Sequence, residues 1–276
     1  MMQENQLLVN GLSINISSAG SPYGRPVIFL HSASFSLEMW KNQLHAPALQ
    51  QYRLIALDFP GHGKSEHSKE PGKHYTFKGL SNILIGFIQE LQLTDYLLVG
   101  LSLGTNIIAE AIPKLRNCKG IVLGGPTMFN NECSPEKIFL PSPYGHITVT
   151  PHPPEKDLDN LIGSALGSLS TEYFQYGKKA FLQTDPVYRS ILGQVLVNQE
   201  WTDQIANLRS AEIPLCIIQG KKENIVKAGY LESIKWSLWG NRIHYLEDAM
   251  HFVNWEDRYF NETLTNYAMF AFNGRK

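Results

Sequence analysis

The sequence of 276 residues contains few cysteines, no long hydrophobic run and almost no net charge. The three cysteines, Cys118, Cys133 and Cys216, are an odd number and lack the spacing of a metal site. We therefore expect a reducing compartment and no disulfide framework. No apolar stretch approaches the roughly 20 residues that span a bilayer, so we expect no transmembrane helix.

The charge balance argues against partners that are themselves highly charged. Lysine and arginine number 24 and aspartate and glutamate 25, so the formal net charge is −1 at pH 7. This balance offers no electrostatic reason to bind nucleic acid or an anionic membrane. The start of the chain also lacks the basic and apolar segments of a secretory signal. We expect a cytoplasmic protein that acts on a small molecule, and the oligomeric state stays open.

Short apolar runs alternate with helix-like stretches through the first half of the chain. An alternating stretch around Asn10 and Gly11 predicts a hairpin, and Thr76 is placed to cap a helix. Further buried strands are predicted at residues 26–30, 53–57, 96–99 and 121–125. A helix is also predicted around residues 37–49. This alternation predicts an α/β fold with a mostly parallel, twisted sheet flanked by helices.

The alternation stops after residue 126 and resumes near residue 214. The intervening stretch begins rich in proline, asparagine and serine and continues with helix-like segments. One of these helices opens at Asp185 and Pro186, a capping residue followed by proline at the first helical position. Strands at residues 214–220 and 242–246 and a last helix then follow. We predict a core of residues 1–126 and 206–276 with a helical cap insertion of residues 127–205.

Ser102 is the candidate nucleophile. It lies in the sequence Gly-Leu-Ser-Leu-Gly at residues 100–104, between a predicted strand and a predicted helix. A serine at so sharp a junction is held in a strained conformation that projects its hydroxyl. Gly100 and Gly104 are small, as the close approach of their backbones requires. The alternative is a glycine-rich turn with an incidental serine.

A serine hydroxyl needs a base to take its proton and a third group to orient that base. Glu223 and His251 each follow a predicted strand, on the side of an α/β sheet where sites form. An imidazole exchanges protons readily at neutral pH, so His251 is the candidate base and Glu223 the acid that orients it. For His251 the alternative is a loop histidine bonded to backbone. For Glu223 the alternatives are a solvated charged loop, suggested by Lys221 and Lys222, and Asp248 as the acid.

The oxyanion hole requires two backbone N–H groups aimed at the developing charge. We assign one to Leu103, directly after the nucleophile, and the other to Ala33, in the loop after the first central strand. No H-E-x-x-H, paired C-x-x-C or phosphate-binding glycine loop is present. We therefore expect neither a metal nor a cofactor.

Together these residues resemble the α/β-hydrolase superfamily over nearly the whole chain. The matching motifs are His-Ser-Ala at 31–33, Asp-Phe-Pro-Gly-His-Gly-Lys-Ser at 58–65, residues 100–104, Gly-Lys-Lys-Glu at 220–223, and His251. Within the superfamily, the chain is similar to the small cofactor-free N-acyl-homoserine lactonases, which also use a glutamate where most relatives have aspartate. The resemblance implies the α/β-hydrolase fold with a helical cap and a Ser-His-Glu triad.

Several residues depart from the lactonase pattern. Ser32 replaces the usual glycine after the loop histidine, and Ala33 stands where the lactonase has a polar side chain. Met250 precedes His251 where glycine is common. Leu161 falls where the lactonase has a cap tyrosine associated with substrate contact. These departures leave the choice between ester and lactone open.

The sequence predicts a serine hydrolase of carboxylic esters or lactones that forms an acyl-enzyme, with N-acyl-homoserine lactones as one substrate class. Candidate pocket residues are His31, Leu161, Tyr173, Phe174 and Phe252. For His31 the alternative is a buried residue that braces its loop, and for the aromatic residues it is packing of the cap on the core. Alternative functions are ligand binding without catalysis, acyl transfer, or hydrolysis of a carbon–carbon bond with the same triad.

Overall fold

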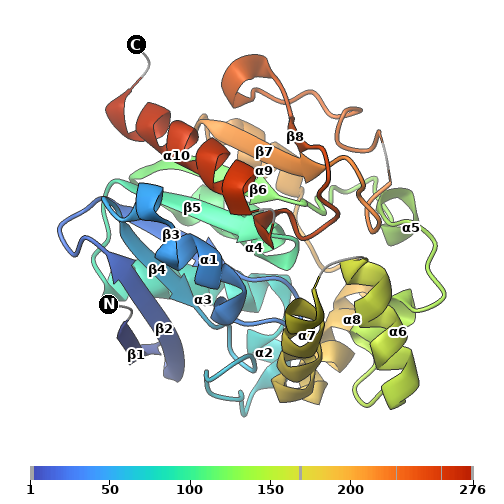
Figure 1. Ribbon diagram of the computed structural model, residues 1–276. Helices are drawn as coiled ribbons and strands as arrows, with labels where there is room; N and C mark the ends of the chain where they lie inside the picture. Colours follow the sequence, from blue (N-terminus) through green and yellow to red (C-terminus); the bar gives the residue numbers. More distant parts are fainter. Residues whose placement is uncertain (1–2, 168–169, 228, 256, 275–276) are drawn as a thin grey trace.

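The computed structural model describes residues 3–167, 170–227, 229–255 and 257–274. Its eight strands form one sheet in the order β1-β2-β4-β3-β5-β6-β7-β8, with helices on both faces (Figure 1). The β1–β2 and β2–β4 pairs are antiparallel, and every other pair is parallel. The predicted α/β fold with a mostly parallel sheet is confirmed.

The secondary-structure elements have the following bounds. The strands are β1 (Gln3–Val9), β2 (Leu12–Gly20), β3 (Pro26–Leu30), β4 (Arg53–Leu57), β5 (Tyr96–Leu101), β6 (Cys118–Gly124), β7 (Leu215–Gly220) and β8 (His244–Leu246). The α-helices are α1 (Lys41–His45), α2 (Pro71–His74), α3 (Phe77–Glu90), α4 (Leu103–Ala111), α5 (Pro135–Ile138), α6 (Glu155–Leu166), α7 (Thr171–Gln183), α8 (Pro186–Asn198), α9 (Gln204–Ser210) and α10 (Asp257–Asn273). The 3₁₀ helices are η1 (Leu37–Trp40), η2 (Pro47–Leu49), η3 (Ile112–Lys114), η4 (Gly145–Val149), η5 (Trp239–Asn241) and η6 (Val253–Trp255).

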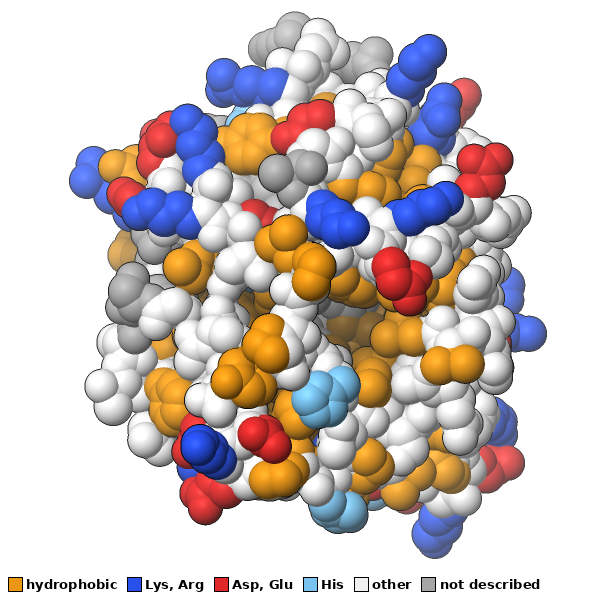
Figure 2. All heavy atoms as spheres, turned by 90° about the vertical axis from the view of Figure 1, so that its right-hand side faces the viewer, with side chains coloured by type: hydrophobic (Ala, Val, Ile, Leu, Met, Phe, Trp, Pro, Cys, Tyr) orange, Lys and Arg blue, Asp and Glu red, His pale blue; other side chains and the backbone are white. Residues whose placement is uncertain are grey.

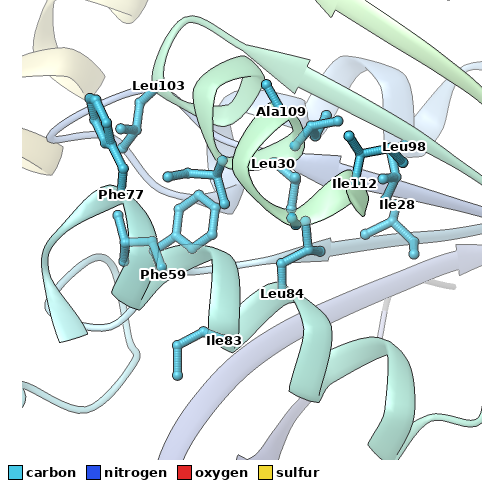
Figure 3. Packing of buried hydrophobic residues seen from close by; sticks show 14 of the residues in the cluster. Ile28, Leu30, Phe59, Phe77, Ile83, Leu84, Leu98, Leu103, Ala109 and Ile112 are labelled. Atoms are coloured by element: carbon cyan, nitrogen blue, oxygen red, sulfur yellow. The ribbon is translucent and has the colours of Figure 1, made fainter. Parts of the chain in front are cut away.

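The central strands are buried on both faces, which explains their continuous apolar sequences. Successive residues of β3 point to opposite sides, so Ile28 and Leu30 join one hydrophobic cluster and Val27 and Phe29 join another. Figure 3 shows the first cluster, in which Leu84 of α3 lies near the side chains from β3. The sheet is thereby packed on both faces, and the loops at the strand ends begin from buried strands.

Most local signals in the sequence correspond to elements of the structure. The hairpin turns at Asn10 and Gly11, which both have positive φ angles, of 50° and 84°. Thr76 caps α3 by accepting a hydrogen bond from the Gly79 N–H, and Asp185 caps α8. The single helix predicted at residues 37–49 is wrong, because the segment forms η1, α1 and η2. Proline at the start of η2 forces Ala46 into an extended conformation (ψ 121°), which interrupts the helix.

Helices α5 to α9 separate β6 from β7 in the chain. Of these, α6, α7 and α8 lie together at one end of the molecule (Figure 1). Tyr176 of α7 hydrogen-bonds Ser36, in the loop after β3. The Asp185 N–H donates to the Gly61 carbonyl, in the loop after β4, at 2.7 Å. These helices therefore contact the loops that follow central strands, while the proposed boundaries of core and cap stay a prediction.

Two further observations concern the whole described chain. No described helix combines the length and the hydrophobicity required to cross a membrane. All three cysteines are free, and Cys216 is fully buried within β7.

Candidate active site

Ser102 occupies a sharp turn between β5 and α4. Its backbone has φ 49° and ψ −114°, a conformation that costs a residue with a side chain about 1–3 kcal/mol. The Ser102 N–H donates to the Gly124 carbonyl at 3.0 Å, which ties the turn to the end of β6. The surrounding packing thus maintains the strain that the sequence predicted at this junction.

The two flanking glycines are sterically required. A Cβ atom on Gly100 would lie 2.6 Å from the carbonyl carbon of Gly104. A Cβ atom on Gly104 would lie 2.4 Å from the Leu30 carbonyl oxygen. The turn can therefore close only without side chains at these positions. Leu103 follows as the first residue of α4, so its N–H lies at the positive end of the helix dipole.

Glu223 lies in the turn after β7, and its side chain is only 8% exposed. Its Oε1 accepts hydrogen bonds from the N–H groups of Ile225 and Val226, at 2.7 and 3.2 Å. Its Oε2 accepts from the Gln219 side-chain amide at 2.7 Å. Burial is the largest single influence and raises the pKa of Glu223. The His251 ring and the two backbone N–H groups together outweigh burial, so the pKa lies below its ordinary value.

His251 lies directly against this carboxylate. Its Nδ1 is 3.1 Å from both Oε1 and Oε2 of Glu223, and its side chain is 1% exposed. A Cβ atom on Gly125 would be 3.2 Å from the His251 ring, so the ring packs on the backbone just after β6. Since Ser102 bonds Gly124 at the same strand end, the structure brings Ser102, His251 and Glu223 to one region.

Among the described residues, no hydrogen bond joins the Ser102 hydroxyl to the His251 ring. Catalytic hydrogen bonds of this kind are often long without substrate and shorten in the reacting complex.

The competing carboxylate, Asp248, does not meet His251. Asp248 forms an ion pair with Lys222 at 2.6 Å, and its side chain is 78% exposed. The Lys222 N–H also donates to the Ala249 carbonyl at 3.0 Å, which ties the loop after β7 to the loop after β8. The lysines before Glu223 therefore belong to a solvated surface, while Glu223 itself points inward.

His31 and Ala33 belong to the loop after β3. The His31 ring is fully buried, with Nδ1 2.8 Å from the Ser32 carbonyl, and its Nε2 accepts a hydrogen bond from the Phe59 N–H at 2.9 Å. Burial lowers the pKa of His31 to about 4, so the ring is neutral at pH 7 with its proton on Nδ1. His31 therefore braces the loop that carries Ala33. Its role as a pocket residue stays a prediction.

The other predicted pocket residues are partly or fully involved in packing. Tyr173 stacks on Trp255 with ring centroids 4.5 Å apart, and its hydroxyl accepts from the Asn42 amide at 2.9 Å. Phe252 stacks on Trp255 at 4.7 Å and contacts Phe35 at 5.0 Å. Leu161 and Phe174 are partly buried hydrophobic residues packed against the same cluster. Their contact with substrate stays a prediction.

The face that lies to the right in Figure 1 is hollowed near its centre, and hydrophobic side chains gather around the hollow (Figure 2). A separate groove of about 540 Å³ is lined by Pro47, Arg258 and Thr265, among others, and includes no predicted site residue. The described residues contain no group of three or more His, Cys, Asp or Glu side chains able to hold a metal ion.

Two site neighbours escaped the sequence analysis, namely Gln219 and Gly125. Gln219 immediately precedes the glycine that ends β7, and Gly125 directly follows Gly124, the last residue of β6. Both lie one residue from a strand end. Only this position distinguishes them in sequence, because their roles depend on contacts with Glu223 and His251.

Comparison with solved structures supports the architecture. The chain is similar to N-acyl homoserine lactonase AidH complexed with N-butanoyl homoserine, with a TM-score of 0.89, 22% identity and 99% coverage of both chains. It is also similar to an esterase from Exiguobacterium antarcticum, with a TM-score of 0.77 and 19% identity, over 97% of this chain and 100% of the esterase. At these identities the likeness concerns the fold alone.

Sequence comparisons agree with this fold. A family model described as alpha/beta hydrolase fold matches residues 25–258. The chain is also 30% identical over 120 residues to the non-heme chloroperoxidase CPO-A1 of Kitasatospora aureofaciens, covering 42% of each protein. The chain spans 38% and 42% of the length of two haloperoxidase relatives, so these matches cover only part of each.

Proposed function

Because the chain belongs to the alpha/beta hydrolase fold family, we propose that it is a serine hydrolase of carboxylic esters or lactones. The observation that carries the proposal is the contact between His251 Nδ1 and both oxygens of Glu223, at 3.1 Å. The strained backbone of Ser102 beside the same strand end supports it. A nucleophile, a base and an orienting acid are the groups that acyl transfer to water requires.

In the proposed reaction, the Ser102 hydroxyl attacks the substrate carbonyl while His251 takes its proton. The N–H groups of Leu103 and Ala33 stabilise the oxyanion of the tetrahedral intermediate. His251 then returns the proton to the leaving oxygen, and an acyl-enzyme on Ser102 remains. A water molecule, deprotonated by His251, then attacks the acyl carbon, the bond to Ser102 Oγ breaks as His251 returns the proton to that oxygen, and the acid is released. Glu223 holds the His251 proton on Nδ1 and stabilises the imidazolium ion throughout.

The environment of Glu223 suits this role. Because its pKa lies below the ordinary value, the carboxylate stays ionised at neutral pH and can accept the Nδ1 proton. Four groups converge on it, from Gln219, Ile225, Val226 and His251, and they make five contacts because His251 Nδ1 lies against both oxygens. A carboxylate held from so many sides keeps one orientation, which is what a fixed histidine tautomer requires.

For the substrate, we propose small esters or lactones, with N-acyl-homoserine lactones as the first class to test. The similarity in fold to a lactonase and to an esterase does not distinguish the two classes. The resemblance of residues 220–223 to the lactonases, with glutamate as the acid, favours lactones. We propose that the helices between β6 and β7 cover the site as a cap and select the acyl group, and that no cofactor takes part.

The experiment is a measurement of proton release from a panel of N-acyl-homoserine lactones and aryl esters. Ser102→Ala should lose activity by several orders of magnitude, up to about 10⁶-fold, because the nucleophile is absent. Ser210→Ala, at an exposed serine whose hydroxyl donates to the Asn207 carbonyl, is the matched control and should retain full activity.

Each outcome decides between functions. Lactone opening that disappears in Ser102→Ala supports the lactonase, and ester cleavage alone supports an esterase. Wild-type activity that survives in Ser102→Ala contradicts the proposed nucleophile. Saturable binding of panel members without turnover would favour a ligand-binding protein instead.

A further inference from the structure

The C-terminal turn of cap helix α6 is attached to the loop that carries Glu223. The Asn224 side-chain amide donates to the Ser164 carbonyl at 2.6 Å and to the Ala165 carbonyl at 3.3 Å. The last carbonyls of a helix have no partner within the helix, so they are free to accept such bonds. Asn224 therefore supplies, from outside the helix, a hydrogen-bond donor for the last carbonyl groups of α6.

The same helix end contacts the loop that carries His251. Gly167 ends α6 with a positive φ of 58°, and its N–H closes the last turn by donating to the Gly163 carbonyl at 2.9 Å. A Cβ atom on Gly167 would lie 2.3 Å from the Met250 sulfur, so the thioether packs directly on this glycine. A larger residue than glycine would displace the Met250 side chain and would also be strained by the positive φ at this position.

These two contacts involve the sequence neighbours of two proposed triad residues. Asn224 directly follows Glu223, and Met250 directly precedes His251. Asn224 also lies within the turn whose N–H groups, at Ile225 and Val226, bond the Glu223 carboxylate. Any movement of Asn224 moves those donors relative to the carboxylate.

We propose that Asn224 is a positioning residue, which orients Glu223, and through it His251, by tying the turn after β7 to the end of α6. The inference rests on the proposed hydrolase function and adds a residue to it. Helix α6 also carries the predicted pocket residue Leu161. The same helix would therefore border the proposed pocket and hold Glu223 in place. Asn224 touches neither substrate nor the reacting atoms, and it acts on kcat rather than on substrate binding.

The alternative is that Asn224 serves only to complete the end of α6. A purely structural role would lower the stability of the cap but leave the Glu223–His251 pair unchanged. The two roles are separated by a readout of the pair itself. The ¹⁵N shifts of the His251 ring, observed through its carbon-bound protons and assigned with His251→Asn, provide that readout without any substrate.

The test variant is Asn224→Leu, which keeps the approximate side-chain volume and removes the amide donor. We expect the His251 ring shifts to move toward those of Glu223→Gln, in which the ring no longer faces a carboxylate. We also expect kcat on any hydrolysed panel substrate to fall about 10- to 100-fold, with KM changed less than about threefold, because a small misplacement of a catalytic group has this effect. Asn224→Ser, which is too short to reach α6, should behave similarly and serves where the leucine variant does not fold.

Ser164→Ala is the matched control, because it removes an exposed hydroxyl and keeps the carbonyl that Asn224 uses. It should leave the His251 shifts and kcat at wild-type values. Met250→Ala should move the shifts in the same direction as Asn224→Leu but less far.

The proposal is overturned if a folded Asn224 variant shows wild-type ring shifts while only its unfolding temperature falls. It is also overturned if Ser164→Ala disturbs the pair as much as Asn224→Leu does. If the wild type hydrolyses nothing, the proposed function fails, but the ring shifts still decide whether Asn224 positions the pair.

Discussion

His31 and His251 are both almost completely removed from solvent, yet their surroundings prepare them for different roles. His31 has both ring nitrogens engaged with backbone groups, and burial lowers its pKa to about 4. His251 is equally buried but has a carboxylate against Nδ1. Burial alone therefore does not make a histidine a structural residue. The partner decides, because only a charged partner can stabilise the imidazolium ion that proton transfer creates.

His62 extends the first kind of environment. Its Nδ1 lies 3.0 Å from the Pro60 carbonyl, and its ring meets Tyr188 edge-on at 4.3 Å. Burial, followed by the nearby His31, lowers the pKa of His62 well below its ordinary value. The loops after β3 and β4 are thus braced by neutral rings, whereas the loops after β7 and β8 meet through a contact between a histidine ring and a carboxylate.

The largest effect should follow loss of the proposed base. His251→Asn removes the group that accepts the Ser102 proton, so we expect kcat to fall by about 10⁶-fold. The unfolding temperature should change far less than the activity. Steady-state hydrolysis and thermal unfolding, measured on the same preparation, check this. Retention of more than a hundredth of the wild-type kcat would remove His251 from the mechanism.

A somewhat smaller effect should follow loss of the charge on the acid. Glu223→Gln keeps the side-chain shape but allows the wrong histidine tautomer, and we expect kcat to fall about 10⁴-fold. Asp248→Asn, at the exposed carboxylate paired with Lys222, is the matched control and should keep wild-type activity. A larger loss in Asp248→Asn than in Glu223→Gln would reverse the assignment.

His31→Leu should affect stability more than chemistry. It leaves the Ser32 carbonyl and the Phe59 N–H without their buried partner, at a cost of about 2–5 kcal/mol in the free energy of unfolding. Urea unfolding measures this, with His45→Leu, at an exposed histidine bonded to the Lys41 carbonyl, as the control. An unchanged unfolding midpoint would show that His31 does not brace its loop.

The two environments should also respond to acid in different pH ranges. For His31, the unfolded pKa of 6.5 exceeds the folded value of about 4. Between these two pH values the unfolded state binds more protons than the folded state, so stability falls as the pH is lowered. For Glu223, the folded pKa lies below 4.5, so its contribution is present above pH 4.5 and is lost as the pH falls through the folded value. Urea unfolding from pH 7 to pH 3 should show both losses. In Glu223→Gln, the loss of stability at the lower pH should be absent and the loss due to His31 should remain.

Much of the fold follows from local sequence patterns. The apolar strands, the hairpin at Asn10 and Gly11 and the caps at Thr76 and Asp185 depend on residues close together in the chain. The turn at Ser102 is local too, because its flanking glycines are dictated by backbone contacts of a strand–turn–helix unit. The broken segment at residues 37–49 was missed because one proline outweighed an otherwise helical pattern.

The candidate site likewise has features that follow from local sequence and features that depend on tertiary contacts. The sequence by itself determined the order of serine, acid and histidine and the position of each at the end of a strand, because strand ends and turns are coded by nearby residues. Only the tertiary structure decided that Glu223, and not Asp248, lies against His251. It also decided that Gln219 donates to the acid and that Asn224 bonds the end of α6. These choices depend on how the loops after β7 and β8 pack on each other and on α6, and such contacts join residues far apart in the chain.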